Sequence, residues 1–361
     1  MTSTLVVSDL HLGSRAGSDV LRREGVLEAL LEALDGVDRL VLLGDTFELR
    51  QGSAATVLER SRHVLERIGA WLGDRPIVLV PGNHDHALIG GWLERRAEPL
   101  GLEVRCAPED ASFIAASAAA MLGPAPVEMA YPGLWLREGV YATHGHYLDV
   151  HMTVPTIERL AVAVSGRISL DGRGRWDDVR APDDYEAVIA PVYAWVHAAA
   201  QTGRASDAVE GARTVRGWEA LRGRRGRNLR AHALPLLFPW LVRAANAAGL
   251  GPLRSELSVE ELRRAGLRAA SAVVERLEVD ARHVIFGHTH RAGMLADDEA
   301  AEWLTPNGAR LHNPGSWNFA RHFARGPESP YWPGGAVLVE DGSRPRLLRL
   351  LGDRTAAQLG G

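Results

Sequence analysis

Five short apolar runs in the sequence each end in a polar cluster that contains Asp, Asn or His. The runs are Leu5 to Val7, Leu40 to Leu43, Ile77 to Val80, Val140 to Tyr141 and Val284 to Phe286. Short apolar runs bounded by Gly or Pro predict buried strands. Reactive residues that directly follow such strands meet at the carboxyl edge of a sheet, so residues far apart in sequence can share one site.

Helical patterns separate the first three runs. Val20 to Leu34 and Val57 to Leu72 carry apolar residues at helical spacing, and the alternation of strand and helix predicts an α/β fold. A further strand is expected at Leu102 to Arg105, whereas the rest of the segment up to Val140 has no clear pattern. Strand-like runs resume at Ala336 to Val339 and Leu347 to Leu351.

The segment from Tyr147 to Asp280 has a different texture. It lacks convincing strand patterns and contains several helical stretches rich in Ala, Leu and Arg. We interpret it as a helical insertion that splits the main domain. The expected organisation is a domain of residues 1–149 and 281–353, a helical insertion or cap of residues 150–280, and a flexible tail of residues 354–361.

The overall composition is that of a globular protein, with 361 residues, 46% hydrophobic and 24% charged. The formal net charge of −4 gives no overall attraction to polyanions, so nucleic acid binding is not excluded but lacks support. The single Cys106 cannot form an internal disulfide, and the first candidate site residue, Asp9, leaves no room for a cleavable signal peptide. We therefore expect a cytoplasmic protein. No charge-free apolar run reaches the roughly 18 residues of a membrane span, so no transmembrane segment is expected.

The polar clusters form an ordered set of blocks. They read Ser8-Asp9-Leu10-His11, Gly44-Asp45, Gly82-Asn83-His84-Asp85, Thr143-His144-Gly145-His146 and Gly287-His288-Thr289-His290. Side chains two apart on an extended segment point to the same side, so Asp9 with His11, and His288 with His290, are expected to act as local pairs. Spacing alone leaves open which ion each side chain faces.

This set of blocks resembles the signature of the calcineurin-like metallophosphoesterases, which reads D-x-H, G-D, G-N-H-D/E, a single H, and G-H-x-H. The resemblance covers the motif-bearing parts of roughly residues 1–149 and 281–320. It implies a layered β-sandwich flanked by helices and a dinuclear metal centre. By this resemblance one ion would be bound by Asp9, His11, Asp45 and His290, and the other by Asp45, Asn83, His144 and His288, with Asp45 bridging them.

The resemblance further implies a hydrolase that cleaves a phosphodiester, phosphomonoester or pyrophosphate bond by a metal-bridging hydroxide between ions roughly 3.5–4 Å apart. Mn²⁺ is the expected metal, and Fe or Zn²⁺ also suits a set of carboxylate, amide and imidazole ligands. His84 would act at the leaving oxygen, where general-acid catalysis is typically worth about 10²–10⁴-fold. Asp85 is expected to orient His84. Many relatives carry Asp three residues after the bridging Asp, where this chain has Glu48, so the orienting role of that position is open.

Three more histidines lie near these blocks in the sequence. His86, His146 and His151 could contact phosphate or support the metal ligands, and the alternative is that they are solvent-facing loop residues.

The insertion carries a basic cluster followed by the apolar stretch Leu234 to Leu241, which contains Trp240. Such a pair of segments is compatible with peripheral contact at an anionic membrane surface, or with an acyl chain held near a diphosphate. The alternative to membrane or lipid contact is a solvated basic helix that packs beside a buried helix. The cluster consists of Arg204, Arg213, Arg216, Arg222, Arg224, Arg225, Arg227 and Arg230.

A helical insertion at this place also resembles, in part, the cap of UDP-2,3-diacylglucosamine pyrophosphohydrolases, which cleave a lipid-linked nucleotide diphosphate. Enzymes of that branch often carry Arg where this chain has His84, and usually His-Gly-Asp where it has His144-Gly145-His146. One alternative is a nucleotide or nucleic-acid phosphodiesterase that uses the basic cluster to grip phosphates. An alternative of another class is a catalytically inactive metal-binding scaffold. The retention of His84, which metal binding alone does not need, argues against it.

Overall fold

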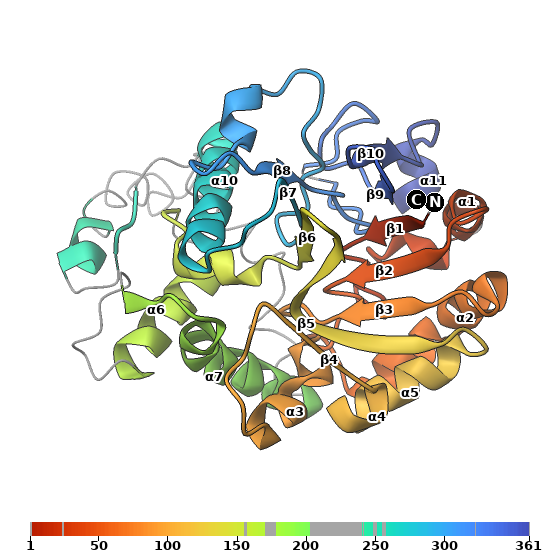
Figure 1. Cartoon of the computed structure of the whole chain (residues 1–361), viewed down its shortest axis with the longest axis horizontal. Helices are drawn as coiled ribbons and strands as arrows, with labels where there is room; N and C mark the ends of the chain where they lie inside the picture. The colour runs from red at the N-terminus through yellow and green to blue at the C-terminus, as the bar shows by residue number, and fades with distance from the viewer. Residues whose placement is uncertain are drawn as a thin grey trace, which may run out of the picture.

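The computed structural model describes residues 2–23, 25–154, 157–169, 178–202, 240, 242–247, 251–254, 258–321 and 323–360. Its strands form one continuous hydrogen-bonded path in the order β10-β9-β1-β2-β3-β5-β6-β7-β8, with β4 paired to β5 (Figure 1). The strands are β1 Ser3–Val7, β2 Arg39–Leu43, β3 Ile77–Val80, β4 Glu103–Cys106, β5 Val127–Arg137, β6 Val140–Thr143, β7 His283–Phe286, β8 Arg310–His312, β9 Gly335–Glu340 and β10 Arg346–Arg349.

The long strand β5 links two halves of this path. Its beginning, Val127 to Met129, runs parallel to β3, and its end, from Gly133 to Arg137, pairs antiparallel with β6. Apolar side chains from both halves pack into one buried cluster, so the halves face each other as a β-sandwich. The cluster includes Val6, Val41, Leu43, Val78, Val80, Ala130, Leu134, Val140, Ala142, Ile285, Val337 and Val339.

The strands read as unbroken apolar runs because both of their faces are buried. In β2, Leu40 and Leu42 pack in the core formed with α1 (Val26–Ala33) and α2 (Ala54–Leu72), whereas Val41 and Leu43 face the other half of the sandwich. Successive side chains of a strand point to opposite faces, and parallel strands covered on both sides have no polar face to present. The remaining elements on this side are η1 Val20–Arg22, η2 His86–Leu88, α3 Gly90–Arg95, α4 Pro108–Ala111, α5 Phe113–Leu122 and α11 Ala356–Gly360.

Helices from residues 147–280 cover the outer face of the second half. Buried residues of α7 (Pro182–Gln201) and α10 (Val259–Arg276) share a core cluster with Val284 and Phe286 of β7, and Figure 1 shows both helices on that side. The other elements there are η3 His146–Val150, α6 Ile157–Ser169 and η5 Ala300–Trp303. The fold is thus an α/β sandwich flanked by helices, as predicted.

Two details differ from the sequence-based prediction. The expected helix Val20 to Leu34 is divided into η1 and α1, with Gly25 in a left-handed conformation (φ 72°) before α1. Strand β5 lies in a segment to which no pattern could be assigned. The segment 354–361 contains α11, whose Leu359 is buried in the core, and the flexibility expected of this tail stays a prediction.

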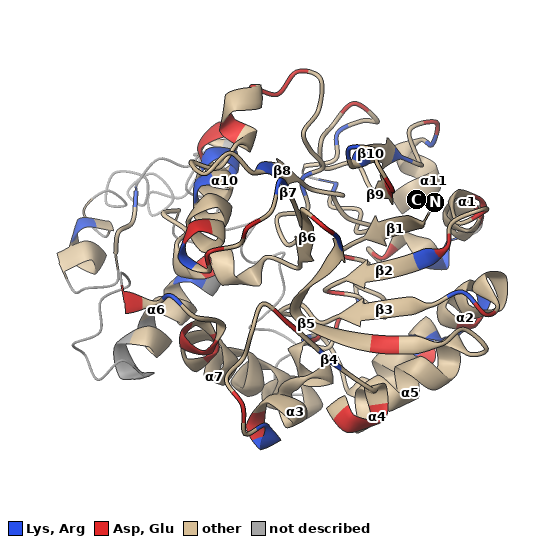
Figure 2. Ribbon diagram, in the orientation of Figure 1, with Lys and Arg blue, Asp and Glu red and all other residues tan. Residues whose placement is uncertain are grey.

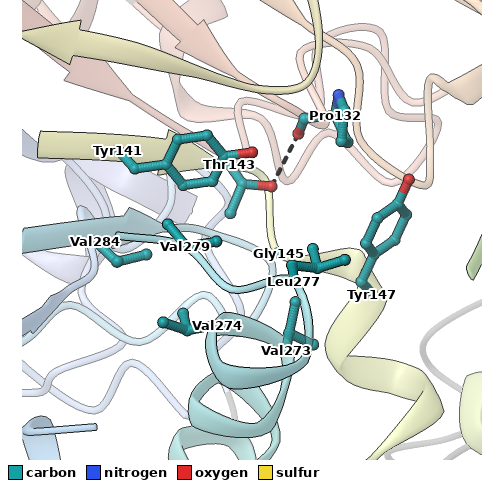
Figure 3. A pocket seen from close by; sticks show the side chains of 10 residues that line it. All are labelled: Pro132, Tyr141, Thr143, Gly145, Tyr147, Val273, Val274, Leu277, Val279 and Val284. Atoms are coloured by element: carbon teal, nitrogen blue, oxygen red, sulfur yellow. Dashed lines mark hydrogen bonds between the residues drawn. The ribbon is translucent and has the colours of Figure 1, made fainter. Parts of the chain in front are cut away.

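An apolar pocket lies between α10 and the strands β6 and β7 (Figure 3). Val273 and Val274 of α10 and Leu277, the residue after this helix, line the pocket, and the hydroxyl of Thr143 is already used in a hydrogen bond to Pro132 O (2.9 Å). None of the described residues that line this pocket is a carboxylate or an imidazole, so we interpret it as a packing gap behind the sheet rather than a site of chemistry.

Among the described residues, basic and acidic side chains lie close to one another around α10. Figure 2 shows basic and acidic segments interspersed on α10 and the neighbouring loops, and Arg263 and Arg264 of α10 pair with Glu302. The basic cluster Arg204 to Arg230 lies outside the described residues, as does Leu234 to Leu241 apart from Trp240, which is exposed. Within the described part of the chain, no helix combines the length and the apolar character needed to cross a bilayer.

Candidate metal centre

The candidate ligands follow directly on strands that lie side by side. Strands β1, β2 and β3 run parallel to one another, and β6 runs parallel to β7. Their carboxyl ends therefore meet at one edge of the sandwich. Asp9, Asp45, Asn83, His144 and His288 occupy the turns immediately beyond these ends.

The backbone at this edge is unusual. Among the described residues, six that are not glycine have a positive φ, and five of them belong to the candidate site. Residues held in this region cost about 1–3 kcal/mol each, and such strain concentrates at functional sites. The local pairs are therefore built by left-handed turns and not by the extended geometry expected from the sequence. The five are Asp9 (56°), His11 (47°), Asp45 (51°), His288 (64°) and His290 (57°).

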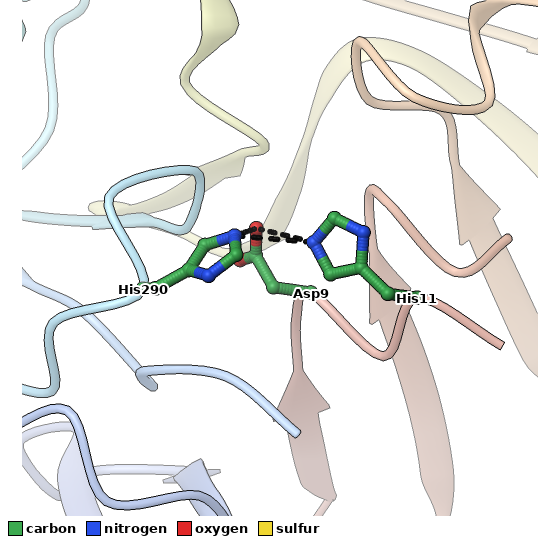
Figure 4. A group of neighbouring side chains, drawn as sticks. All are labelled: Asp9, His11 and His290. Atoms are coloured by element: carbon green, nitrogen blue, oxygen red, sulfur yellow. Dashed lines mark hydrogen bonds and ion pairs between the residues drawn. The ribbon is translucent and has the colours of Figure 1, made fainter. Parts of the chain in front are cut away.

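One group of ligand atoms comes from the loop after β1 and the loop after β7 (Figure 4). Asp9 Oδ1 lies 3.1 Å from His290 Nε2 and 3.8 Å from His11 Nε2, and the two Nε2 atoms are 3.1 Å apart. The other oxygen, Asp9 Oδ2, accepts hydrogen bonds from Ser8 Oγ (2.6 Å) and from the main-chain N–H of His288 (3.0 Å). Asp9 Oδ1 is buried with no hydrogen-bond donor among the described residues, which leaves it free for a cation.

A second group lies beside the first. His144 Nε2 is 3.4 Å from Asp45 Oδ2 and 3.2 Å from Asn83 Oδ1, and His288 Nδ1 is 3.1 Å from the same amide oxygen. Asp45 Oδ2 is also 3.8 Å from His11 Nε2. Asp45 is therefore the carboxylate that lies between the two groups, and its oxygens can serve both.

Three of the four histidines have one ring nitrogen engaged by a fixed acceptor. His144 Nδ1 donates to Leu43 O (3.0 Å), His11 Nδ1 to Glu48 Oε2 (3.1 Å), and His288 Nε2 to Asp149 Oδ1 (2.9 Å). Each acceptor holds the proton on the outer nitrogen and turns the lone pair of the other nitrogen toward the centre. Metal-binding histidines are oriented in this way, so the residues fit divalent cations.

The amide of Asn83 fits the same conclusion. With Oδ1 toward the two imidazoles, the amide presents an oxygen to the centre of the second group. The reversed amide would instead donate to Asp45 and accept from Arg50 Nη2 (2.9 Å). A bound cation favours the first orientation because it needs an oxygen ligand there.

The buried carboxylates and histidines of the site shift one another's pKa values. Burial by itself would lower the pKa of His144, but Asp45 beside it outweighs burial and raises that pKa to about 10. In the same way, hydrogen bonding to Glu48 together with the charge of Asp45 overcomes burial and raises the pKa of His11 to about 9. Burial would raise the pKa of Asp9, but His290 outweighs it and lowers the value to about 2. The site is thus a set of buried carboxylates that require positive charge.

Two glycines are needed for the close approach of these groups. A Cβ atom on Gly82 would lie 2.3 Å from Asp45 Oδ1, and one on Gly287 would lie 2.0 Å from Ser8 Oγ. A side chain at position 82 would displace Asp45, and one at position 287 would displace the loop of Ser8 or its own loop. Either change would separate the loops that carry the candidate ligands.

Glu48, not Asp85, orients His84. The Nδ1 atom of His84 lies 2.8 Å from Glu48 Oε1, and its Nε2 atom lies 3.3 Å from Arg50 Nη1. Burial and the charge of Arg50 lower the pKa of His84 despite Glu48.

Asp85 has a different position from the one expected. Its carboxylate is fully buried and accepts main-chain hydrogen bonds from the loop after β2 and from Gly82, which ties the second block to the third. Burial and the nearby Asp45 raise the pKa of Asp85 to about 6. The expectation that Asp85 orients His84 therefore does not match the observed hydrogen bonds, since both of its oxygens face main-chain N–H groups. The other donors are Asp45 (3.3 Å), Thr46 (2.8 Å) and Phe47 (3.2 Å).

The three additional histidines contact residues of α7 or of β5. His86 Nε2 lies 3.0 Å from Glu186 of α7, and His146 Nε2 lies 3.1 Å from the hydroxyl of Tyr131. His151 Nε2 lies 2.7 Å from the hydroxyl of Tyr185. These hydrogen bonds are all to protein groups around the site.

Sequence reasoning did not identify Arg50 or Tyr193 as site residues. Arg50 is buried beside His84, and Tyr193 of α7 packs over its guanidinium, with 5.4 Å between Arg50 Cζ and the ring centroid. Glu48 carried a visible signal by its spacing from Asp45, whereas nothing local in the sequence marks Tyr193.

Comparison with known proteins gives one family. The sequence profile of the calcineurin-like phosphoesterases matches residues 2–201, which is more than half of the 361-residue chain. A search of curated proteins gives no match.

Solved structures with some likeness include a dimetal phosphatase from Danio rerio, which is 13% identical with a TM-score of 0.36 and for which the alignment covers 97% of this chain and 99% of that one. A cold-active protein-tyrosine phosphatase from a psychrophilic Shewanella species is also 13% identical, with a TM-score of 0.32 and coverage of 98% and 79%. These scores are too low to support an argument. The family match and the convergence of its motif residues in space carry the conclusion: the chain belongs to the calcineurin-like phosphoesterase family and is a metal-dependent phosphoester hydrolase.

Proposed function

We propose that the protein hydrolyses a phosphate ester or diphosphate at a dinuclear centre. The observation that carries this proposal is the pair of ligand groups that share Asp45: its Oδ2 atom lies 3.4 Å from His144 Nε2 and 3.8 Å from His11 Nε2. A carboxylate between two such groups can bridge two cations, and two-metal sites are typical of phosphoester hydrolysis.

The two ligand sets that we propose are those implied by the family resemblance. One cation would be held by Asp9, His11, Asp45 and His290, and the other by Asp45, Asn83, His144 and His288. Mn²⁺ is our proposal for the metal, and Fe or Zn²⁺ is compatible with the same mixture of oxygen and nitrogen ligands. The cations would supply Lewis-acid activation of the phosphoryl group and of a water molecule.

The protein residues around the cations would position the substrate and control protons. His84, oriented by Glu48, is the candidate to interact with the leaving oxygen. The negative charge of a bound phosphate favours the charged form of a nearby imidazole, which offsets the effect of Arg50 on His84. Asp85 would act indirectly, by holding the loop of Asp45 against the loop of Asn83.

Turnover of bis-p-nitrophenyl phosphate by the Mn²⁺-loaded protein tests this function. We expect turnover by the wild type, and loss of turnover with reduced Mn²⁺ content in Asp45→Asn. Asp74→Asn, an exposed change in the turn before β3, is the matched control and should behave as the wild type. A metal-loaded wild type without turnover, unaffected by His84→Ala, would favour the inactive scaffold.

The substrate class is a second question. A lipid- or nucleotide-linked diphosphate is one proposal, supported by the partial resemblance to UDP-2,3-diacylglucosamine pyrophosphohydrolases, and a nucleotide or nucleic-acid phosphodiester is the alternative. The helical insertion of residues 150–280 would act as a cap, with peripheral membrane contact in a cytoplasmic protein if the substrate is a lipid. Rates on nucleotide diphosphate lipids, cyclic nucleotides and simple monoesters would separate these classes.

A further inference from the structure

Arg50 is a buried cation that forms no ion pair with the described residues. Its side chain is at the metal centre and the residue is 6% exposed. Nη1 of Arg50 lies 3.3 Å from His84 Nε2. Its Nη2 lies 2.9 Å from the side-chain amide atom of Asn83 that faces away from His144 and His288. No carboxylate of the described residues lies within 4.0 Å of the guanidinium, and its Nε has no hydrogen-bond partner there. Buried charges are normally paired, so an external anion is the natural partner.

Tyr193 completes this corner of the site. It comes from α7 in the insertion, is 4% exposed, and its hydroxyl has no hydrogen-bond partner among the described residues. Its ring lies over the Arg50 guanidinium and 5.4 Å from the ring of His86. Burial raises the pKa of its phenol well above the ordinary value, so the hydroxyl keeps its proton and can donate. A buried hydroxyl without a partner is costly unless a ligand supplies one.

The position of Tyr193 is fixed from the same helix. Glu186, seven residues earlier and hence two turns away on the same face, is buried and accepts hydrogen bonds from the hydroxyls of Tyr131 and of Tyr147 (2.7 Å). It also lies 3.0 Å from His86 Nε2. These contacts hold α7 against the main domain, so Tyr193 faces Arg50 without depending on a ligand.

We propose that Arg50 and Tyr193 form an anion subsite that binds phosphoryl oxygens of the substrate beside the cations. The inference rests on the proposed function and deepens it, because the insertion then contributes directly to substrate binding. A guanidinium presents a planar fork of N–H donors that matches two oxygens of one phosphate, and the Tyr193 hydroxyl adds a further donor. The ligand class is a tetrahedral phosphate anion, of which inorganic phosphate is the smallest member.

Equilibrium binding of inorganic phosphate to the Mn²⁺-loaded full chain, measured by isothermal titration calorimetry, tests the subsite without turnover. Arg50→Met should weaken phosphate binding by about 10–100-fold, since it removes charge-assisted hydrogen bonds. Tyr193→Phe should weaken it by roughly 3–10-fold, as expected for one neutral donor. Arg50→Lys keeps the charge but not the fork, so it should fall between Arg50→Met and the wild type.

The controls are matched to these variants. Arg62→Met removes an exposed arginine of α2, and Tyr185→Phe removes a hydroxyl of α7 that already bonds His151; neither should change phosphate binding. Manganese content and melting temperature of each variant report folding and metal loading.

The outcomes separate the two proposals. Wild-type turnover together with unchanged phosphate binding in Arg50→Met and Tyr193→Phe would overturn the subsite alone. A wild type that neither retains manganese nor hydrolyses phosphoesters would overturn the proposed function, and the subsite would fall with it.

Discussion

Replacement of Glu48 by Gln tests how the protein orients two functional imidazoles with one carboxylate. Glu48 is 2% exposed, and its two oxygens serve His84 Nδ1 (2.8 Å) and His11 Nδ1 (3.1 Å). Gln has almost the same shape but only one acceptor oxygen. One imidazole must therefore face an NH₂ group, so its Nδ1 has to become the acceptor and its proton has to move to Nε2.

The consequence depends on which imidazole changes its proton. If the proton of His11 moves to Nε2, that nitrogen loses the lone pair with which it would bind the cation beside Asp9 and Asp45. Metal affinity then falls. If His84 changes, catalysis falls while metal affinity remains. Hydrogen bonds to charged groups contribute about 1.5–3 kcal/mol each, and loss of an orienting partner typically reduces metal affinity or activity by about 10–100-fold. This range corresponds to about 1.4–2.8 kcal/mol.

The assay combines Mn²⁺ titration with steady-state kinetics on bis-p-nitrophenyl phosphate. We expect Glu48→Gln to lower either the Mn²⁺ affinity or kcat at saturating Mn²⁺ by about 10–100-fold. Glu59→Gln, on the exposed face of α2, is the matched control. Wild-type Mn²⁺ affinity and kcat in Glu48→Gln would refute the role given to this carboxylate.

Three further outcomes are expected. Asp149→Asn should weaken Mn²⁺ binding by about 10–100-fold because it replaces the charged acceptor of the His288 Nε2 proton by a neutral amide. An unchanged Mn²⁺ titration would exclude Asp149 as the orienting partner of His288. Mn²⁺ binding should release protons: His11 and His144, with pKa values raised to about 9 and 10, carry protons at pH 8 that must leave before nitrogen coordinates. Apparent affinity should therefore rise with pH up to that range. Calorimetry at pH 8 in two buffers of different ionisation enthalpy measures the release, and identical heats would contradict it. Gly82→Ala should abolish Mn²⁺ binding at the second ligand group because its Cβ would lie 2.3 Å from Asp45 Oδ1, and normal manganese content in that variant would show that the loops can separate without loss of the site.

The sequence predicted the parts of this molecule that depend on local signals. The apolar runs before Asp9, Asp45 and Asn83 are the strands β1, β2 and β3, because strands buried on both faces leave a continuous apolar pattern. Strand β5 escaped prediction since it contains Pro132 and Gly133, residues that weaken a strand pattern, at the place where it passes from one half of the sandwich to the other.

Orientation within the site could not be predicted because it depends on distant contacts. The exchange of roles between Glu48 and Asp85 follows from the left-handed turn at Asp45, which turns the main-chain N–H groups of residues 45–47 toward Asp85. Arg50 and Tyr193 meet only because α7 docks on the main domain through Glu186. No local pattern encodes that docking.

Anomalous scattering at the manganese edge from crystals of the Mn²⁺-loaded protein tests the central claim most directly. We expect two peaks about 3.5–4 Å apart: one among Asp9, His11 and His290, the other among Asn83, His144 and His288, with the Asp45 carboxylate between them. A single peak, or peaks away from Asp45, would contradict the dinuclear centre.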